Sequence, residues 1–215
     1  MNLMSFESSK IVGGVAALLL FCSLFISFLV FYAGVIIGFT SIILILFSLL
    51  GLSRHYQNVR ISKFALIGTV VGIIGITIAV VFAAVVFLPS AENLMYQIDP
   101  GWSGDWNSPP SMAFDVDQLL NNFDLSVAYA VFLNMAIIAV ILLPTAIIAT
   151  YFIRQSLKQL SENSNISLFG TTGTLLLIGA FLSIIAIGLI LIWIAALLLA
   201  LSFLQLKPPT PTAYT

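Results

Sequence analysis

The fold is decided by the stretch Pro89–Asp124, which reads PSAENLMYQIDPGWSGDWNSPPSMAFDVDQLLNNFD. This stretch carries six of the eight acidic residues of the chain and no lysine or arginine. The sequence on either side is strongly apolar, and all seven basic residues lie there, in short segments far from the acidic stretch. The pattern predicts two membrane-embedded halves joined by a polar loop over residues 89–124.

The composition indicates a polytopic membrane protein of the all-α class. Hydrophobic residues make up 61% of the chain and charged residues only 7%, whereas a soluble domain is about a quarter charged. The apolar runs are long enough for helices that cross a bilayer. The single cysteine, Cys22, excludes an intramolecular disulfide and a metal site built from cysteines.

Six transmembrane helices are expected, arranged as a hairpin, a single helix, the loop, a second single helix and a second hairpin. The uncharged runs 11–53 and 168–206 are too long for one crossing, so each must bend, at Tyr32–Gly34 and at Gly188. Pro89 is expected to end the third helix. One domain therefore covers residues 1–206, and the Pro/Thr-rich tail 207–215 is expected to be disordered. The expected helices are about 11–31, 35–53, 64–88, 125–153, 170–187 and 189–206.

The basic residues select six crossings over four. With six crossings all seven fall on one face of the membrane, whereas four crossings would divide them between both faces. The positive-inside rule then predicts a multi-pass protein of the cell membrane with both termini cytoplasmic and the loop 89–124 outside. Both hairpin bends are apolar, so either hairpin could instead turn within the membrane, shielded by other helices. The basic residues are Lys10, Arg54, Arg60, Lys63, Arg154, Lys158 and Lys207.

Three short patterns resemble an uncharacterised archaeal family of small predicted polytopic membrane proteins. They are Ser9–Gly14 (SKIVGG), Leu49–Tyr56 (LLGLSRHY) and Phe64–Gly75 (FALIGTVVGIIG). The resemblance covers the first third of the chain best and the last hairpin loosely. It implies an archaeal source and brings no catalytic residues, because the function of that family is unknown.

The predicted helices contain no ionisable residue that could do chemistry. An acid or base inside a membrane helix is a functional hypothesis by default, and its absence argues against ion coupling and intramembrane proteolysis. His55, the only histidine, lies in a basic loop on the opposite side from the acidic loop, so no Ser-His-Asp set can form. We expect no enzyme activity, no cofactor and no metal site; the spacing of Asp99 and Asp105 is not that of a calcium loop.

Glycines at helical spacing are the candidate packing residues. Small residues three or four positions apart allow helix backbones to approach closely in lipid. Two interpretations remain open: packing within one chain, or a role as a dimer seam or a pore lining. The residues are Gly34, Gly38, Gly68, Gly72 and Gly75.

The fourth predicted helix carries the remaining polar candidates. Asn134 is the most polar group placed in the bilayer, and it could join helices or bind a solute. Pro144 removes a backbone donor and is expected to kink the helix, with Thr145 able to bond a freed carbonyl.

The acidic loop combines its charges with aromatic residues. We expect Trp102, Trp106 and Phe123 to order part of it at the membrane surface. A short amphipathic helix is expected over residues 115–123, leading into the next helix through Asp124 as a cap.

The sequence thus favours a non-enzymatic structural or accessory membrane component that packs or oligomerises through its glycine faces. The alternative is a small uncoupled channel or carrier for a neutral solute, with Asn134, Pro144 and Thr145 near its path. The expected partners are the lipid bilayer and either further copies of the chain or a larger membrane complex, with no nucleic acid.

The sidedness leads to a first prediction. A cysteine at Ser103 should react with an impermeant thiol reagent in intact cells, and one at Ser161 should not, because the two positions face opposite sides. Labelling of each variant, with the unsubstituted protein as the control for Cys22, measures this. The reverse pattern would exclude the topology.

Overall fold

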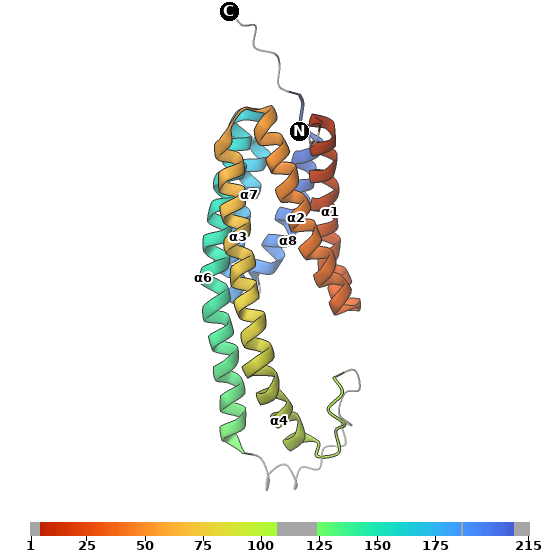
Figure 1. Cartoon of the computed structure of the whole chain (residues 1–215), viewed down its shortest axis with the longest axis vertical. Helices are drawn as coiled ribbons and strands as arrows, with labels where there is room; N and C mark the ends of the chain where they lie inside the picture. Colours follow the sequence, from red (N-terminus) through yellow and green to blue (C-terminus); the bar gives the residue numbers. More distant parts are fainter. Residues whose placement is uncertain (1–4, 107–123, 186, 209–215) are drawn as a thin grey trace, which may run out of the picture. The chain divides into compact units, whose positions relative to one another are not determined.

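The computed structural model describes residues 5–106, 124–185 and 187–208, which form helices and no strand (Figure 1). The all-α prediction is confirmed for this part of the chain. The helices are α1 (Phe6–Leu29), α2 (Phe31–His55), α3 (Val59–Phe82), the π-helical turn η1 (Ala83–Phe87), α4 (Leu88–Ile98), α6 (Leu125–Ser164), α7 (Ser167–Leu182), the 3-10 turn η2 (Ser183–Ile185) and α8 (Ile187–Leu204).

Within the described residues, five helical stretches are long and apolar enough to cross a membrane. The apolar helix α7 has 16 residues, about 24 Å at 1.5 Å per residue, and is shorter than the hydrocarbon core of a typical bilayer. The finding supports a membrane protein. Five helices qualify by length and composition, and α7 is set apart only because it is shorter. The five are Phe6–Ser27, Ala33–His55, Val59–Ile98, Leu125–Ser164 and Ile187–Leu204.

The prediction that Pro89 ends the third helix is wrong. The helix continues through η1 into α4 and ends at Ile98. Pro89 occupies the first turn of α4, and in η1 the Leu88 amide donates to the Ala83 carbonyl five residues earlier. The π-helical turn inserts a residue just before the proline, which has no amide hydrogen to contribute to a regular α-helical ladder.

Three other predicted boundaries also differ. The helix expected to end before Arg154 continues to Ser164, because polar side chains of its last turns bond to neighbouring helices. The first bend lies at Val30, with an extended backbone (φ −140°), and Gly34 is inside α2. The second bend is η2, and Gly188 lies in α8, where its backbone approaches the Gly179 carbonyl and leaves no room for a side chain.

The chain divides into two compact units, which we describe separately. Unit 1 comprises Met1–Ile73 and Thr145–Thr215, and unit 2 comprises Ile74–Pro144. Unit 1 therefore contains α1, α2, α7 and α8 with the first part of α3 and the second part of α6. Unit 2 contains the rest of α3, η1, α4 and the first part of α6.

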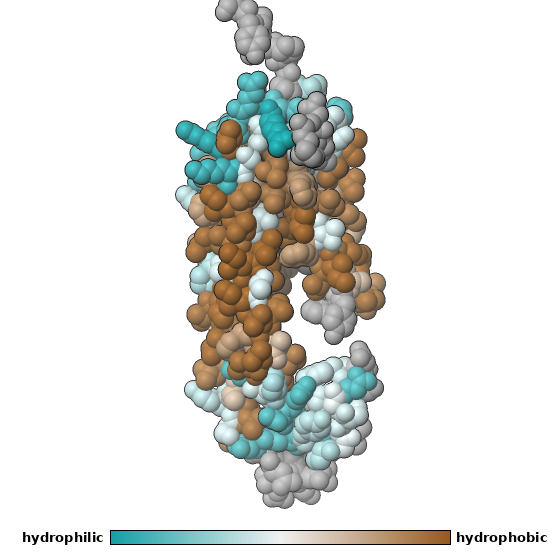
Figure 2. All heavy atoms as spheres, viewed as in Figure 1, coloured by the Kyte–Doolittle hydropathy of each residue, from teal (hydrophilic) through white to brown (hydrophobic). Residues whose placement is uncertain are grey.

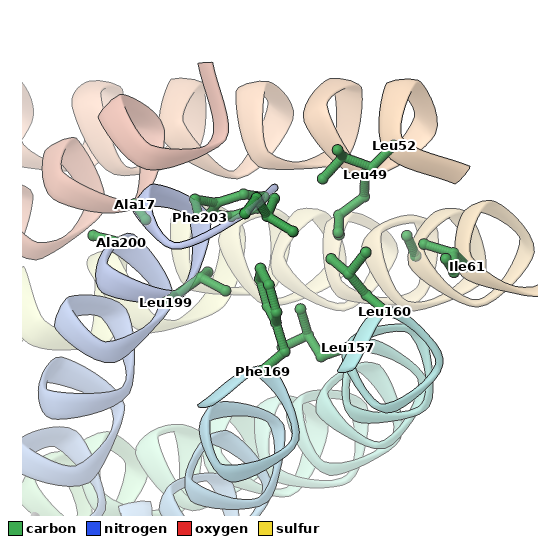
Figure 3. Close-up of a cluster of buried hydrophobic side chains, with 12 residues drawn as sticks. Ala17, Leu49, Leu52, Ile61, Leu157, Leu160, Phe169, Leu199, Ala200 and Phe203 are labelled. Atoms are coloured by element: carbon green, nitrogen blue, oxygen red, sulfur yellow. The ribbon is translucent and has the colours of Figure 1, made fainter. Parts of the chain in front are cut away.

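The core of unit 1 is one cluster of buried apolar side chains contributed by six helices (Figure 3). Phe169 of α7 and Phe203 of α8 are fully buried and meet edge to face, with ring centroids 5.4 Å apart. Aromatic pairs in this geometry add about 0.5–1.5 kcal/mol to their burial. The other members are Ala17, Leu49, Leu52, Ile61, Ala65, Leu157, Leu160, Leu199, Ala200 and Leu206.

Helix α1 packs against both α2 and α8, so the first and last helices of the chain are neighbours. The indole ring of Trp193 stacks on Phe21, with centroids 4.7 Å apart, and its Nε1 donates to the Phe21 carbonyl at 3.2 Å. This contact satisfies the only polar atom of the Trp193 side chain, which is half-buried between the helices.

Two buried serines of unit 1 link separate helices through hydrogen bonds. The Ser48 hydroxyl of α2 donates to the Ser9 carbonyl of α1 at 2.7 Å, and the Ser156 hydroxyl of α6 donates to the Ile61 carbonyl of α3 at 2.8 Å. By contrast, Ser41 donates to the Ile37 carbonyl of its own helix at 2.7 Å. The two kinds of hydroxyl are equally buried and differ in what they join.

Apolar side chains cover the outward faces of the unit 1 helices, as the brown surface in Figure 2 shows. Ile11 and Phe25 of α1 and Ile190 of α8 are each more than half exposed. Hydrophilic residues gather at the end of unit 1 where the α2–α3 and α6–α7 connections lie (Figure 2). A surface of this kind is typical of helices that face lipid.

The two serine environments lead to a second prediction. Ser48→Ala should lower the free energy of unfolding in detergent by about 1 kcal/mol, because it removes a hydrogen bond between helices. Ser41→Ala should change it by less than about 0.5 kcal/mol, since only a bond within one helix is lost. Thermal unfolding of the two variants measures the difference, and an equal loss would contradict a stabilising role for the Ser48 bond.

Candidate functional site

The basic segments of unit 1 meet at one end, which we call the basic end. The Phe6 ring lies against His55 and Tyr56, with centroids 5.8 and 6.2 Å away. The Tyr56 hydroxyl donates to the Lys207 carbonyl at 3.1 Å. Burial raises the pKa of Tyr56 above its ordinary value, because the charged phenolate is less well solvated there. These contacts bring the start of α1, the end of α2 and the segment after α8 together.

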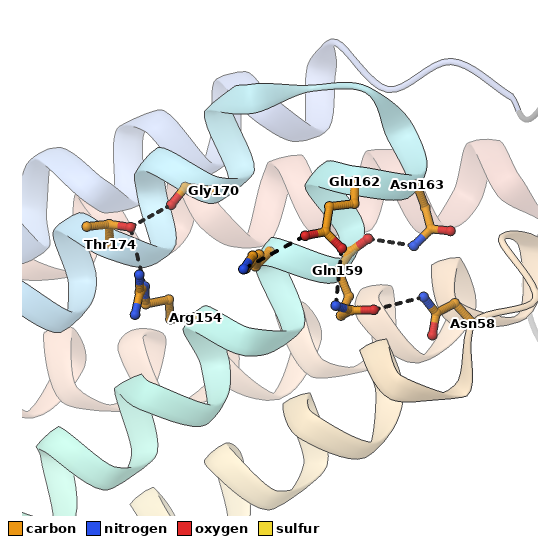
Figure 4. A network of polar contacts seen from close by, with 8 residues as sticks. Asn58, Arg154, Gln159, Glu162, Asn163, Gly170 and Thr174 are labelled. Carbon is orange, nitrogen blue, oxygen red and sulfur yellow. Dashed lines mark hydrogen bonds and ion pairs between the residues drawn. The ribbon is translucent and has the colours of Figure 1, made fainter.

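A network of amides and charges ties α6 to its neighbours at this end (Figure 4). The Asn58 amide, just before α3, donates to Gln159 Oε1 of α6 at 3.2 Å. Gln159 Nε2 donates to Glu162 at 3.2 Å. The Arg154 Nε donates to the Thr174 hydroxyl of α7 at 3.4 Å, and that hydroxyl donates to the Gly170 carbonyl at 3.0 Å. These bonds join α6 to α7 and to Asn58, the residue just before α3.

This network holds helices together and offers no catalytic set. Its members are neutral amides, one hydroxyl that donates to a backbone carbonyl, and charged groups near the surface. The ion pair between Lys158 and Glu162 spans 4.0 Å, and more than half of each side chain is exposed. Such a pair contributes about 0–1 kcal/mol. Nucleophilic catalysis would need a hydroxyl bonded to a base, which this network does not provide.

Asn134, the candidate for a solute site, lies in unit 2 beside the π-helical turn. Its side chain is 8% exposed, and its amide donates to the Ser90 hydroxyl at 3.0 Å. Ser90 in turn donates to the Val86 carbonyl at 2.9 Å. Asn134 therefore joins α6 to α4 at the point where Pro89 disturbs the helical ladder. Sequence reasoning missed Ser90 because the proline before it was read as the end of the helix.

Pro144 and Thr145 are not brought together with Asn134 at a site. Pro144 lies inside α6, and the boundary between the two units falls between Pro144 and Thr145. Helix α6 continues through this proline, from Leu125 to Ser164.

The candidate glycines contact helices of the same chain. Gly34 of α2 lies against the backbone of Ser27 in α1, and a side chain on Gly38 would meet Ser23 Oγ at 3.2 Å. A Cβ atom on Gly68 of α3 would lie 2.8 Å from the Ala149 carbonyl oxygen of α6.

The last two candidate glycines lie further along α3. A Cβ atom on Gly72 would lie 3.6 Å from the Ala149 Cβ, an ordinary contact. Gly75, in unit 2, is buried.

The part of the acidic loop that the structure describes is packed around Trp102. This side chain is 6% exposed, and its ring lies 5.4 Å from Tyr96 and 5.0 Å from Trp106. The predicted partner Phe123 and the predicted helix 115–123 lie outside the described residues. Among the residues described, no group of three His, Cys, Asp or Glu side chains is placed to hold a metal ion.

Asp124 begins α6 as a cap, as its position suggested. Its Oδ1 accepts a hydrogen bond from the Ser126 amide at 2.8 Å. The hydrogen bonds from Ser126 lower the pKa of the Asp124 carboxyl, because they stabilise its charged form. The Asp124 amide donates to Gln97 of α4 at 3.1 Å, which fixes the two helix ends of unit 2 to each other.

Two pockets in unit 1 were not predicted. One, of about 390 Å³, is lined by apolar and aromatic side chains of α6 and α7, among them Ile147, Tyr151 and Phe181. The other, of about 450 Å³, lies between α2 and α3 at the basic end. No sequence motif marks either pocket, because each depends on how neighbouring helices lean together.

These features define a class, an all-helical protein with several apolar helices of membrane-spanning length. A family model described as "Protein of unknown function (DUF996)" matches residues 35–197, well over half of the chain. The chain belongs to the DUF996 family. Of the three patterns that suggested an uncharacterised family, Leu49–Tyr56 and Phe64–Gly75 fall within the matched region, and Ser9–Gly14 precedes it. No curated protein and no solved structure matches the chain.

The contrast between two glycines of α3 gives a third prediction. Gly68→Ala should lower the free energy of unfolding in detergent by about 1–3 kcal/mol, because its methyl group would press on the α6 backbone. Gly72→Ala is the matched control and should change it little, since its methyl group has room. Thermal unfolding in detergent measures both variants. Equal stability of both variants would show that α3 and α6 do not pack at Gly68.

Proposed function

We propose that the protein is a non-enzymatic component of the cell membrane that supports or accompanies other membrane proteins. The observation that carries this proposal is the division of its side chains. Exposed side chains on the long helices are aliphatic and aromatic, whereas the buried hydroxyls of Ser48 and Ser156 are used in helix packing. A chain organised in this way presents a surface for lipid and for other apolar helices.

In this proposal the chain crosses the membrane six times. The sixth crossing is α7, which the 3-10 turn η2 extends by three residues. The basic end faces the cytoplasm under the positive-inside rule, with the segment 99–106 on the outer side. The contacts of Phe6 and Lys207 with the end of α2 support a common side for both ends of the helical region. The archaeal source expected from the sequence patterns belongs to the same proposal.

The partner surface we propose is aliphatic and aromatic instead of glycine-lined. Gly34, Gly38 and Gly68 already face helices of their own chain, so a second chain would have to meet other positions. In unit 2, large side chains that are more than half exposed form such a surface. They are Val80, Val81, Val85, Leu125, Tyr129, Phe132, Met135 and Val140.

A second candidate function is supported by one observation. Asn134 and Ser90 form a polar pair beside a π-helical turn, a feature that is frequent at functional sites. The alternative is a small uncoupled channel or carrier that passes a neutral solute along this pair. Amide and hydroxyl groups suit such a solute, because they offer hydrogen bonds without charge.

Reconstitution separates the two candidates and provides the fourth prediction. Purified protein in liposomes should pass glycerol and urea no faster than empty liposomes in stopped-flow light scattering. The same protein, extracted in mild detergent, should elute larger than one chain or together with another membrane protein. A monomer without partners would contradict the leading proposal.

The matched variants in the flux assay are Asn134→Leu and Asn163→Leu. Asn163 lies at the basic end, where its amide donates to a carbonyl of its own helix at 2.6 Å. Flux that is present in the unsubstituted protein, lost in Asn134→Leu and kept in Asn163→Leu would establish the channel or carrier instead.

A further inference from the structure

The pocket of about 450 Å³ at the basic end is built from the last turn of α2 and the first turn of α3. It is lined by one guanidinium group, one amide, two hydroxyls and two aliphatic side chains. Polar and apolar residues therefore line one open surface pocket at the ends of two helices. The lining residues are Leu50, Ser53, Arg54, Gln57, Val59 and Ser62.

The donors that this pocket can offer to a ligand belong to Arg54 and Gln57. The hydroxyl protons of Ser53 and Ser62 are already given to the carbonyls of Leu50 and Val59, at 3.1 and 3.0 Å. The guanidinium group of Arg54 makes no hydrogen bond or ion pair with any residue that the structure describes. Arginine presents a planar fork of donors that matches the oxygens of a phosphate group.

The charge around the pocket is positive. Arg60 and Lys63 follow it in α3, and both are exposed. The acid Glu162, at the same end, is engaged by Gln159 and Lys158. An anion in the pocket would therefore lie near cationic side chains. The Glu162 carboxylate would not compete for them, because it is already engaged by Gln159 and Lys158.

The start of α3 adds little to this attraction. Two of its first amides are already bonded to Asn58, the Arg60 amide to the side-chain Oδ1 at 3.0 Å and the Ile61 amide to the backbone carbonyl at 3.2 Å. These two amides are therefore not available to a ligand, and binding depends mainly on side chains. Gln57 has a left-handed backbone (φ 51°), a conformation that is uncommon for residues other than glycine.

We propose that this pocket binds the phosphate of an anionic phospholipid headgroup. Arg54 would hold the phosphate oxygens through two parallel hydrogen bonds, with Gln57 as the second donor, and Leu50 and Val59 would contact the apolar part next to the headgroup. Basic pockets between transmembrane helices on the cytoplasmic side recognise such headgroups. A lipid fits better than a free anion because the pocket lies at the end of the apolar stretch Ala33–His55. The proposal rests on the membrane location but on neither candidate function.

Lipid-dependent unfolding of the full chain in detergent tests this proposal. Phosphatidylglycerol should raise the unfolding temperature by mass action, whereas phosphatidylcholine with the same acyl chains and inorganic phosphate should not. Arg54→Gln should weaken the apparent affinity for phosphatidylglycerol by about tenfold or more, the worth of a charge-assisted hydrogen bond. Arg60→Gln removes a neighbouring charge outside the pocket and should retain the affinity within about threefold.

Two further variants keep the test decisive if Arg54→Gln does not fold. Gln57→Gly removes the amide and suits the left-handed backbone, so it should fold and bind phosphatidylglycerol more weakly. Arg54→Lys keeps the charge without the fork and should bind between the unsubstituted protein and Arg54→Gln.

Three outcomes would overturn the proposal. They are equal stabilisation of the unsubstituted protein and Arg54→Gln by phosphatidylglycerol, equal stabilisation by both lipids, and stabilisation by inorganic phosphate that Arg54→Gln abolishes. The last result would identify a free phosphate ion as the ligand. Oligomer size and solute flux play no part in these readouts, so a failed lipid site and a failed functional proposal remain distinguishable.

Discussion

The structure depends on one constraint, that a buried polar group needs a hydrogen-bond partner. Most buried serines meet this constraint locally, as Ser23 and Ser202 do by donating to carbonyls three or four residues earlier in the same helix. Ser48 and Ser156 instead donate to another helix and thereby fix its position. Thr172 is the exception, since its hydroxyl is buried without a partner among the described residues. The two hydroxyls that bond across helices thus help to decide which helices meet, α1 with α2 and α3 with α6.

Much of the helical pattern could be predicted from the sequence because uncharged runs in this chain are long and their flanks are charged. The errors arose where the prediction rested on the usual structural preference of a single proline or glycine. Pro89 was read as a terminator, but a π-helical turn before it lets the helix continue to Ile98. Gly188 was read as a bend, whereas its missing side chain allows the backbone to approach Gly179. In both cases the deciding contact is with a neighbouring turn or helix, which a single sequence does not display.

The candidate sites show the same division between local and tertiary information. The glycine spacing singled out Gly68 and Gly34, and in the structure both lie close to the backbone of a neighbouring helix, but the spacing could not tell a partner helix of the same chain from one of another chain. Asn134 stood out as the most polar residue in an apolar run, although its partner Ser90 did not. The pocket beside Arg54 has no signature in the sequence at all, because its walls come from two helices joined by a tight turn.

The contact between α1 and α8 has a consequence for biosynthesis. Phe203 lies against Gly13, and Trp193 lies against Phe21, so the first helix finds its final neighbour only when the last helix has been made. A ribosome that adds residues one by one makes α1 long before α8, and domains normally fold as units. The face of α1 that α8 covers therefore stays uncovered until α8 has been made. Lipid or an insertion factor would have to occupy that face in the interval, and contacts so distant in sequence are slow to form.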